Sequence, residues 1–151
     1  MKQGYVGALE RLTRDNRDFR RVLFTAGHLQ LVLMALRPGE EIGSEVHMTH
    51  DQFFRIEKGK GRIRIDGVKI RVAAGDAILV PAGVRHNLTN TGKRRLRLYT
   101  IYAPPNHVDQ LVEATRAIAD AHEKARALAA SAEQGRKDMI DEGGPVAAAT
   151  A

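Results

Sequence analysis

The stretch that decides the fold reads Glu45-Val46-His47-Met48-Thr49-His50-Asp51-Gln52, and His86 belongs to it although it comes later in the chain. Glu45 and His47 are two residues apart in a segment with an extended pattern, so their side chains would lie on the same face of a strand. Gln52 opens an apolar run, and His86 follows a Pro-Ala-Gly turn. A carboxylate, two imidazoles and an amide can bind one divalent metal ion if the strands curl into a small barrel.

Short strand-like segments separated by glycine turns fill the chain around this stretch. The segment 29–36 is almost wholly apolar, which is typical of an inner strand buried on both faces. Asp66-Gly67 is a two-residue hairpin signal, and such a turn makes the neighbouring strands antiparallel. The predicted strands are 19–25, 29–36, 53–57, 62–65, 68–72, 77–80, 86–89 and 96–102. This spacing predicts an all-β sandwich or barrel whose core lies between residues 19 and 103.

The hydrophobic period changes after Pro105. Apolar residues between Val108 and Ala129 recur at spacings of three and four, and Asn106 is a suitable N-cap, so we expect an alanine-rich C-terminal helix. Its apolar stripe would lie on the barrel or on a second subunit. The predicted organisation is an N-terminal arm (1–18), a barrel (19–103), a C-terminal helix (104–130) and a disordered tail (131–151).

Composition excludes several classes of protein. The chain has no cysteine, which rules out disulfides, thiolate nucleophiles and cysteine-bound metal sites. Neither a signal-peptide pattern nor a run long enough to cross a membrane is present, so we expect a cytoplasmic protein without a membrane partner. The net charge of +6 is concentrated at residues 11–21 and 93–97. These clusters lack interleaved aromatic residues and helix-turn-helix spacing, so they predict a solvated basic face and no nucleic-acid partner.

Two blocks of the sequence carry a resemblance to a known family. The block Gly75-x5-Pro81-x-Gly83-x2-His86-x3-Asn90 matches the second conserved motif of the cupin superfamily at every fixed position. The block Glu45-x-His47-x4-Gln52-x3-Ile56-x2-Gly59 has the spacing of the first cupin motif with changed residues. The chain is most similar to small single-domain cupins of the phosphomannose-isomerase-like type (cupin type 2). The resemblance implies a cupin jelly-roll β-barrel, with a C-terminal α-helix added here, a metal ion inside and a homodimer.

The first motif departs from the family pattern at two positions. The usual motif has His-x-His followed by Glu, whereas Glu45 stands at the first histidine position and Gln52 at the glutamate position. The set implied by the resemblance, Glu45, His47, Gln52 and His86, still carries one negative charge, so its attraction for a divalent cation is kept. Two oxygen donors favour manganese, iron(II) or nickel over a closed tetrahedral zinc site. For Gln52, a metal ligand and a buried hydrogen-bond partner both remain open.

An alternative pair of ligands is His47 with His50. Three-residue spacing in an extended segment would turn these two rings to opposite faces, so we prefer Glu45 with His47 and place His50 in a loop near the barrel mouth. The remaining histidines, His28, His107 and His122, are interpreted as structural.

The resemblance implies a metalloenzyme that acts on a small sugar, a sugar acid or a keto or enol acid, by isomerase-like or oxygenase-like chemistry. Glu45 and Tyr99 are the candidate acid/base residues. One alternative is a non-catalytic cupin that binds a small ligand, and another is an interaction protein, for which the apolar helix is the support. A fused DNA-binding domain would favour a sensor, and its absence from this sequence favours an enzyme.

Overall fold

The structure of the protein, a computed structural model, describes residues 3–141. Within this range the chain forms nine strands and two helices. The chain divides into two compact units, of which the first ends at Arg116 and the second begins at Ala117. The elements are α1 (Leu9–Asp15), β1 (Arg20–Thr25), β2 (Gln30–Leu36), β3 (Asp51–Lys58), β4 (Lys60–Ile65), β5 (Val68–Ala73), β6 (Ala77–Val80), β7 (His86–Asn90), β8 (Leu96–Ala103), β9 (Val112–Glu113) and α2 (Arg116–Asp141).

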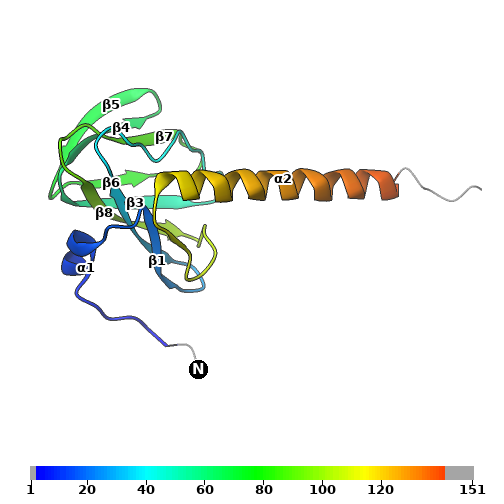
Figure 1. Ribbon diagram of the computed structural model, residues 1–151, viewed down its shortest axis with the longest axis horizontal. Helices are drawn as coiled ribbons and strands as arrows, with labels where there is room; N and C mark the ends of the chain where they lie inside the picture. The colour runs from blue at the N-terminus through cyan, green and yellow to red at the C-terminus, as the bar shows by residue number, and fades with distance from the viewer. Residues whose placement is uncertain (1–2, 142–151) are drawn as a thin grey trace, which may run out of the picture. The chain divides into compact units, whose positions relative to one another are not determined.

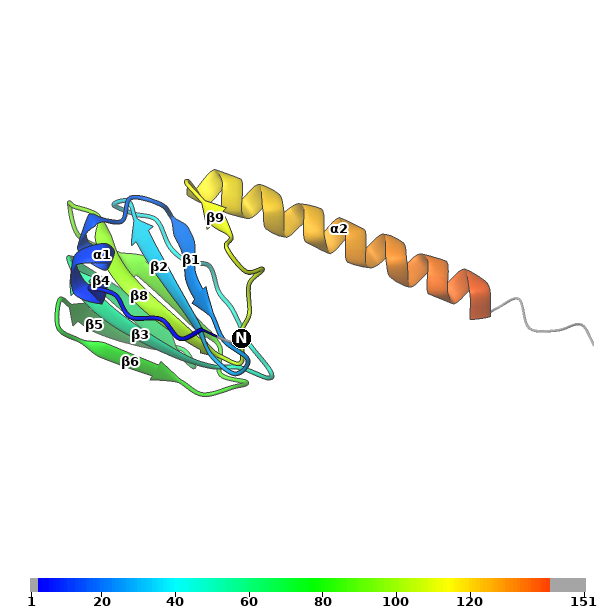
Figure 2. The same cartoon turned by 90° about the horizontal axis from the view of Figure 1, so that it is seen from below.

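The first unit is built from two antiparallel sheets. The larger sheet has the order β6-β3-β8-β2-β1-β9 and the smaller one the order β5-β4-β7. The smaller sheet lies over the larger one, with the core between them (Figures 1 and 2). The predicted all-β architecture with a C-terminal helix is thereby confirmed.

Strand alternation defines which side chains enter the core. In β8, Leu96, Leu98, Thr100 and Tyr102 are buried, while the residues between them are more exposed. The register carries this inward face across the sheet, because Tyr102 pairs with Gln30 of β2 and with Gln52 of β3. The buried polar residues Gln30, Gln52 and Tyr102 therefore lie in one row near one end of these strands.

Strand β2 is buried from Val32 to Leu36, as its continuous apolar run predicts. On the outer face the segment after α1 contributes part of the cover, because the backbone N–H of Ala35 is bonded to the carbonyl of Asp18 at 3.1 Å. Asn16 and Thr13 of the same segment are themselves buried. The N-terminal residues thus pack against the barrel and are hydrogen-bonded to β2.

The C-terminal helix occupies a different range from the predicted 104–130. Residues 106 and 107 lie before the helix, and their backbone N–H groups donate to Gln30 Oε1 at 3.0 and 2.9 Å. Val112 and Glu113 then pair with β1 as β9. The helix begins at Arg116 and runs to Asp141, and side-chain pairs four residues apart support its second half, such as Glu133 with Lys137 at 3.2 Å. Residues 142–151 of the predicted tail lie outside the described residues.

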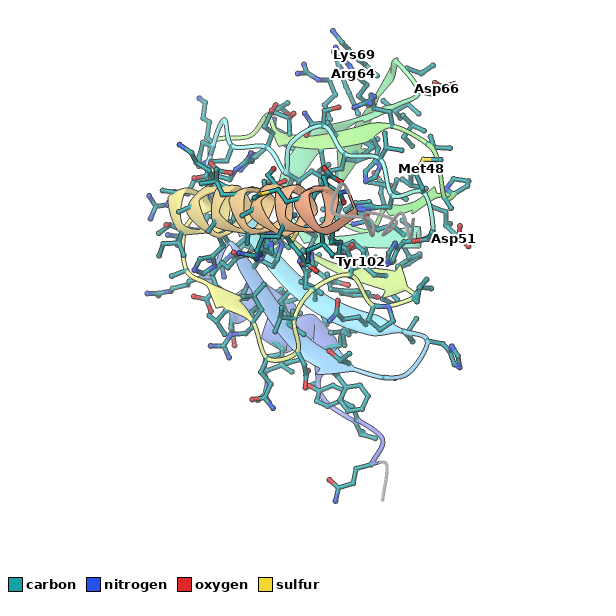
Figure 3. The ribbon with its side chains drawn as sticks, turned by 90° about the vertical axis from the view of Figure 1, so that its right-hand side faces the viewer. Met48, Asp51, Arg64, Asp66, Lys69 and Tyr102 are labelled. Atoms are coloured by element: carbon teal, nitrogen blue, oxygen red, sulfur yellow. The ribbon has the colours of Figure 1, made fainter. Side chains whose placement is uncertain are left out.

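Much of the positive charge lies on the outer face of the smaller sheet. Arg62 is paired directly with Arg71, and Arg64 with Lys69; all four are exposed. Arg64 and Lys69 project from the same face (Figure 3). Separately, neither helix in the described part of the chain combines the length and apolar character needed to cross a membrane.

Candidate metal centre

Residues 41–47 run alongside β7 and bring Glu45 next to His86. Two isolated bridges, Glu41 with Thr89 and Glu45 with His86, hold this segment to the smaller sheet. The Glu45–His86 bridge has both backbone hydrogen bonds, at 2.9 and 3.0 Å. The predicted extended segment is thus tied to the sheet without forming a regular strand, and Glu45 Oε2 lies 3.1 Å from His47 Nε2.

The turn before β7 fixes the position of His86. Gly83 has a φ of +83°, a left-handed conformation that glycine adopts without steric cost. Its N–H donates to the carbonyl of His47 at 2.8 Å. The N–H of Ala82 donates to Oδ1 of Asp51 at 2.9 Å, and Asp51 lies at the start of β3 (Figure 3). One turn therefore connects the segments that carry His47, Gln52 and His86.

Glu45, His47 and His86 form a group that could hold a metal ion. Each offers one ligand atom, and these three atoms lie within 4.8 Å of one another. The side chain of His86 is 1% exposed, whereas those of His47 and Glu45 are 16% and 24% exposed. The group is therefore buried on the His86 side and open to solvent on the Glu45 side, as a site that admits a small molecule requires.

Gln52 adjoins this group from β3. Its Oε1 lies 3.0 Å from His86 Nε2, and its Nε2 donates to Thr100 Oγ1 at 3.0 Å. His86 Nδ1 lies 3.0 Å from the carbonyl of Val84 and must be the donor there, so Nε2 of the neutral ring carries a lone pair. Two lone pairs, on Gln52 Oε1 and His86 Nε2, then face each other in a buried place. A cation bound by both atoms would remove the repulsion between these two lone pairs.

A second arrangement also satisfies Gln52. If its amide is turned by half a rotation, the NH2 group donates to His86 Nε2 and the oxygen accepts from the Thr100 hydroxyl. In that case Gln52 is a buried hydrogen-bond partner that orients His86. The two arrangements correspond to the two roles that the sequence leaves open for this residue.

Tyr102 borders the same group, and the sequence analysis did not single it out. Its ring meets that of His47 edge to face at 5.7 Å and 88°, and its hydroxyl lies 3.3 Å from Nε2 of His107. Burial raises the pKa of Tyr102, the negative charge of Glu45 raises it further, and the positive charge of Arg20 and a hydrogen bond from Gln52 oppose them. Tyr102 is therefore a neutral phenol. Its parity with Thr100 in an alternating strand is the signal that could have identified it.

Tyr99 does not reach the candidate metal centre. It has the opposite parity from Thr100 and Tyr102 in β8, so it lies on the outer face of the sheet, where its ring is 6.3 Å from that of Phe53. The structure therefore does not bring Tyr99 together with Glu45, so of the two residues that the sequence offered as an acid/base, Glu45 is the one that belongs to the donor group.

His50 lies in the loop before β3, as predicted. Its Nε2 is 3.0 Å from the carbonyl of Pro105 and must be the donor there, so this nitrogen has no lone pair available for a metal. Its ring centroid lies 5.8 Å from that of His47. This geometry favours Glu45, and not His50, as the partner of His47 in the donor group.

The donor atoms suit a divalent cation. Two imidazole nitrogens, one carboxylate oxygen and one amide oxygen combine borderline and hard donors, a set that accepts first-row divalent metals. The lone pairs of His86 and Gln52 face each other from 3.0 Å, and Glu45 Oε2 lies 3.9 Å from the same nitrogen of His86. The residues of this structure therefore fit the metal that a cupin motif implies.

Comparison with known proteins agrees with this architecture. Residues 32–102 match the family described as "Cupin domain". YrkC of Bacillus subtilis is 45% identical over 125 residues, which cover 79% of this chain and 67% of that protein. Protein L612 of Acanthamoeba polyphaga mimivirus is 42% identical over 110 residues, covering 70% and 68%. Both names describe their proteins as uncharacterized.

A solved structure extends the agreement to three dimensions. The BH2720 protein of Bacillus halodurans is 45% identical, with a TM-score of 0.78 over 79% of this chain and 95% of that one. The chain therefore belongs to the cupin superfamily, as a small single-domain member of the "Cupin domain" family.

Proposed function

We propose that the protein binds one divalent metal ion through Glu45, His47 and His86, with Gln52 as the fourth ligand. The observation that carries the proposal is the convergence of three ligand atoms within 4.8 Å. The 3.0 Å contact of His86 Nε2 with Gln52 Oε1 supports it, because a cation bound by both atoms would satisfy them in the arrangement in which Gln52 presents its oxygen. Two oxygen ligands favour manganese, iron(II) or nickel over zinc.

We further propose that the protein is a metalloenzyme for a small sugar, a sugar acid or a keto or enol acid, with isomerase-like or oxygenase-like chemistry. A divalent ion held by these residues would supply a Lewis acid with room for a substrate oxygen. Glu45 is the carboxylate of the donor group, and its partial exposure lets it exchange a proton with a bound substrate. Tyr102 remains protonated beside His47 and can donate a hydrogen bond.

A non-catalytic cupin that binds a small ligand is the second candidate. It is favoured by the position of Tyr99 on the outer face, which removes one of the two residues that the sequence offered as an acid/base. Turnover of a substrate by the metal-loaded protein separates the two candidates. Binding of a ligand that is recovered unchanged would support the second one.

Metal analysis of protein purified without chelators tests the shared part of both candidates. We expect about one divalent ion per chain by mass spectrometry of the metal content, as a four-ligand mononuclear site requires. Glu45→Gln should lower the affinity for manganese(II) by more than about tenfold, because it removes the charged ligand. Glu41→Gln is the matched control, since Glu41 bridges the same strand β7 but lies outside the donor group. Equal manganese affinity in the wild type and Glu45→Gln would refute the site.

The remaining expectations on partners stay proposals. We propose a cytoplasmic homodimer whose partner is a small molecule and not a nucleic acid or a membrane. The apolar stripe of α2 supports the dimer, because exposed apolar residues such as Leu128 and Met139 gain from a covering surface.

A further inference from the structure

The outer face of the smaller sheet carries cations that lie directly opposite one another. Arg62 of β4 is in register with Arg71 of β5, and Arg64 is in register with Lys69. All four side chains are exposed, and no acidic residue between positions 3 and 141 forms an ion pair with any of them. Like charges directly opposite each other in a sheet are destabilising. The two pairs therefore lower the stability of the sheet unless an anion binds to them.

Protection of the sheet edge explains only half of these cations. β5 is the outermost strand of the smaller sheet, and charged residues on such a strand hinder edge-to-edge association. β4, in contrast, is paired on both sides, with β5 and with β7, so Arg62 and Arg64 protect no edge. Their neighbours in β7 are Thr89 and Asn87, which supply no negative charge. The cations of β4 therefore need another explanation.

One of the two pairs borders a hollow in the protein surface. The hollow has a volume of about 500 Å³, and its polar side chains belong to Lys60, Arg62, Arg71, Asp76 and Thr91. A volume of this size is within the range of sites that bind small molecules. The second pair, Arg64 with Lys69, projects from the same face but does not line the hollow (Figure 3).

The hollow is separate from the candidate metal centre. His86 is the first residue of β7, and its side chain is buried in the core as part of the donor group. Thr91 follows Asn90, the last residue of the same strand. The two sites therefore lie at opposite ends of β7, and on opposite faces of the smaller sheet.

The charges around the hollow indicate the kind of ligand. Three cations and one carboxylate line it, so two positive charges are in excess. The carboxylate belongs to Asp76, and its Oδ2 already accepts a hydrogen bond from the backbone N–H of Ala73 at 2.7 Å. A phosphate monoester carries a charge of about −1.5 to −2 at pH 7 and matches the excess, whereas a monocarboxylate neutralises only half of it. Arginine also donates two parallel hydrogen bonds to a phosphate group.

A nucleic acid fits this face less well than a small phosphate ester does. Proteins that bind single strands stack the bases on aromatic side chains, and none of the described residues that line the hollow is aromatic. Carboxylates also stand at two borders of the face, because Asp76 lines the hollow and Glu41 is bridged to Thr89 of β7. They would repel the phosphates of a chain that continued past the hollow.

We propose that this hollow is a second ligand site, which binds the phosphate group of a small phosphate monoester. Arg62 and Arg71 are its main ligands, and Lys60 and Thr91 are further donors. A phosphate group bound between the two arginines removes the repulsion between them. The site is additional to the proposed metal centre and does not depend on it.

Glycerol 3-phosphate and glycerol, its uncharged counterpart, are the probes that test the inference. Isothermal titration calorimetry would measure both on the full chain, as purified and after removal of divalent metals with a chelator. We expect glycerol 3-phosphate to bind at least about tenfold more tightly than glycerol, as charge-assisted hydrogen bonds imply. Its affinity should be the same in both preparations. Amide chemical shifts of Gly61 and Thr91 should move during the titration, whereas those of Gln52 and His86 should not.

Arg62→Gln and Arg71→Gln should each lower the affinity for glycerol 3-phosphate by about tenfold or more. Arg64→Gln is the matched control, because Arg64 lies on the same strand and face and is also opposite a cation, but does not line the hollow. It should leave the affinity within about twofold of the wild type. All three positions are exposed, so the variants should fold, and circular dichroism checks this.

Asp76→Asn supplies a variant with the opposite sign. It removes the negative charge from the hollow and keeps an oxygen that can accept from the N–H of Ala73, so the affinity for glycerol 3-phosphate should rise.

Four results would overturn the inference. Equal losses in Arg62→Gln and Arg64→Gln would show a diffuse attraction by the whole face, and no binding at millimolar concentration would show that the hollow is not a site. Loss of binding after metal removal would assign the phosphate to the metal centre. A single-stranded oligonucleotide that binds more tightly than glycerol 3-phosphate, and depends on Arg64 as much as on Arg62, would identify a nucleic acid as the ligand of this face.

Discussion

His86 Nε2 and Gln52 Oε1 lie 3.0 Å apart, and the Nδ1–H of His86 is already committed to the carbonyl of Val84. The two facing atoms are both acceptors in the neutral ring, unless the amide is turned or a cation lies between them. Gln52 is therefore the residue whose role decides between a metal site with four protein ligands and one with three. It is also one of the two residues, with Glu45, at which this chain differs from the family pattern.

Gln52→Glu should raise the affinity for manganese or iron(II). A ligand oxygen that gains a negative charge binds a divalent cation more tightly. We expect the added metal to raise the melting temperature of the variant more than that of the wild type, because a ligand that binds the folded state stabilises it. Differential scanning fluorimetry with and without metal measures both effects.

Gln30→Glu is the control for this change. Gln30 is also fully buried and pairs with Tyr102 in the same row of the sheet, but its Oε1 accepts from the N–H groups of Asn106 and His107. It adds a buried carboxylate outside the donor group, so its metal response should equal that of the wild type. If Gln52→Glu behaves in the same way and also melts earlier in the absence of metal, Gln52 is a core hydrogen-bond partner.

Short-range sequence signals were sufficient to predict the strands and to group the candidate metal ligands. Turn glycines and the alternation of apolar residues are short-range properties, so β4 and β5 around Asp66-Gly67 follow directly from the sequence. The grouping of Glu45, His47 and His86 followed from the register of two motifs on adjacent segments. Local sequence alone does not fix which face of a strand is covered.

Tertiary contacts decide the features that the sequence did not reveal. The start of α2 depends on β1, far away in the chain, because Val112 and Glu113 pair with Arg21 and Arg20 and so keep the preceding residues extended. Arg20 was counted with the surface charges because its buried partner, Glu113, lies on a two-residue strand that no periodicity indicates. Tyr99 was named as a candidate acid/base because the inward parity of β8 was not applied to the tyrosines.

Thr100→Val should lower the metal affinity of the candidate metal centre, although Thr100 is not one of the proposed ligands. The hydroxyl of Thr100 accepts from the Gln52 amide at 3.0 Å, and valine leaves that buried N–H without this acceptor. We expect the free energy of unfolding to fall by about 1–3 kcal/mol, and metal affinity to fall by about 10–100-fold if Gln52 is a ligand. Thr100→Ser retains the hydroxyl and should restore the affinity. An unchanged metal affinity in Thr100→Val would show that the orientation of Gln52 does not matter for metal binding.

The oligomeric state can be measured directly. We expect light scattering coupled to size-exclusion chromatography to give twice the chain mass of 16.6 kDa at micromolar concentration. Leu128→Glu on α2 places a charge on an exposed apolar position and should shift the protein toward the monomer if the helix lies at the interface. Arg126→Glu, a charge change about 200° around the same helix from Leu128, is the control. A monomer mass for the wild type would contradict the proposed dimer.

Tyr102 should impose an alkaline limit on stability. Burial and the charge of Glu45 raise the pKa of Tyr102 in the folded protein, whereas the unfolded chain has the ordinary value of about 10. The folded state therefore retains a proton that the unfolded state loses. The contribution of Tyr102 to the free energy of unfolding is fully present below pH about 10 and decreases above it, by about 1.4 kcal/mol per pH unit.

Tyr102→Phe removes the titrating group, so the unfolding free energy of this variant should fall less steeply than that of the wild type between pH 10 and 11, about one unit above the ordinary pKa of tyrosine. Denaturant titrations of metal-free protein in a chelating buffer measure the slopes. Tyr99→Phe, on the outer face of the same strand, should keep the slope of the wild type. If Tyr102→Phe and the wild type lose stability in parallel, the phenol of Tyr102 does not stay protonated in the folded protein.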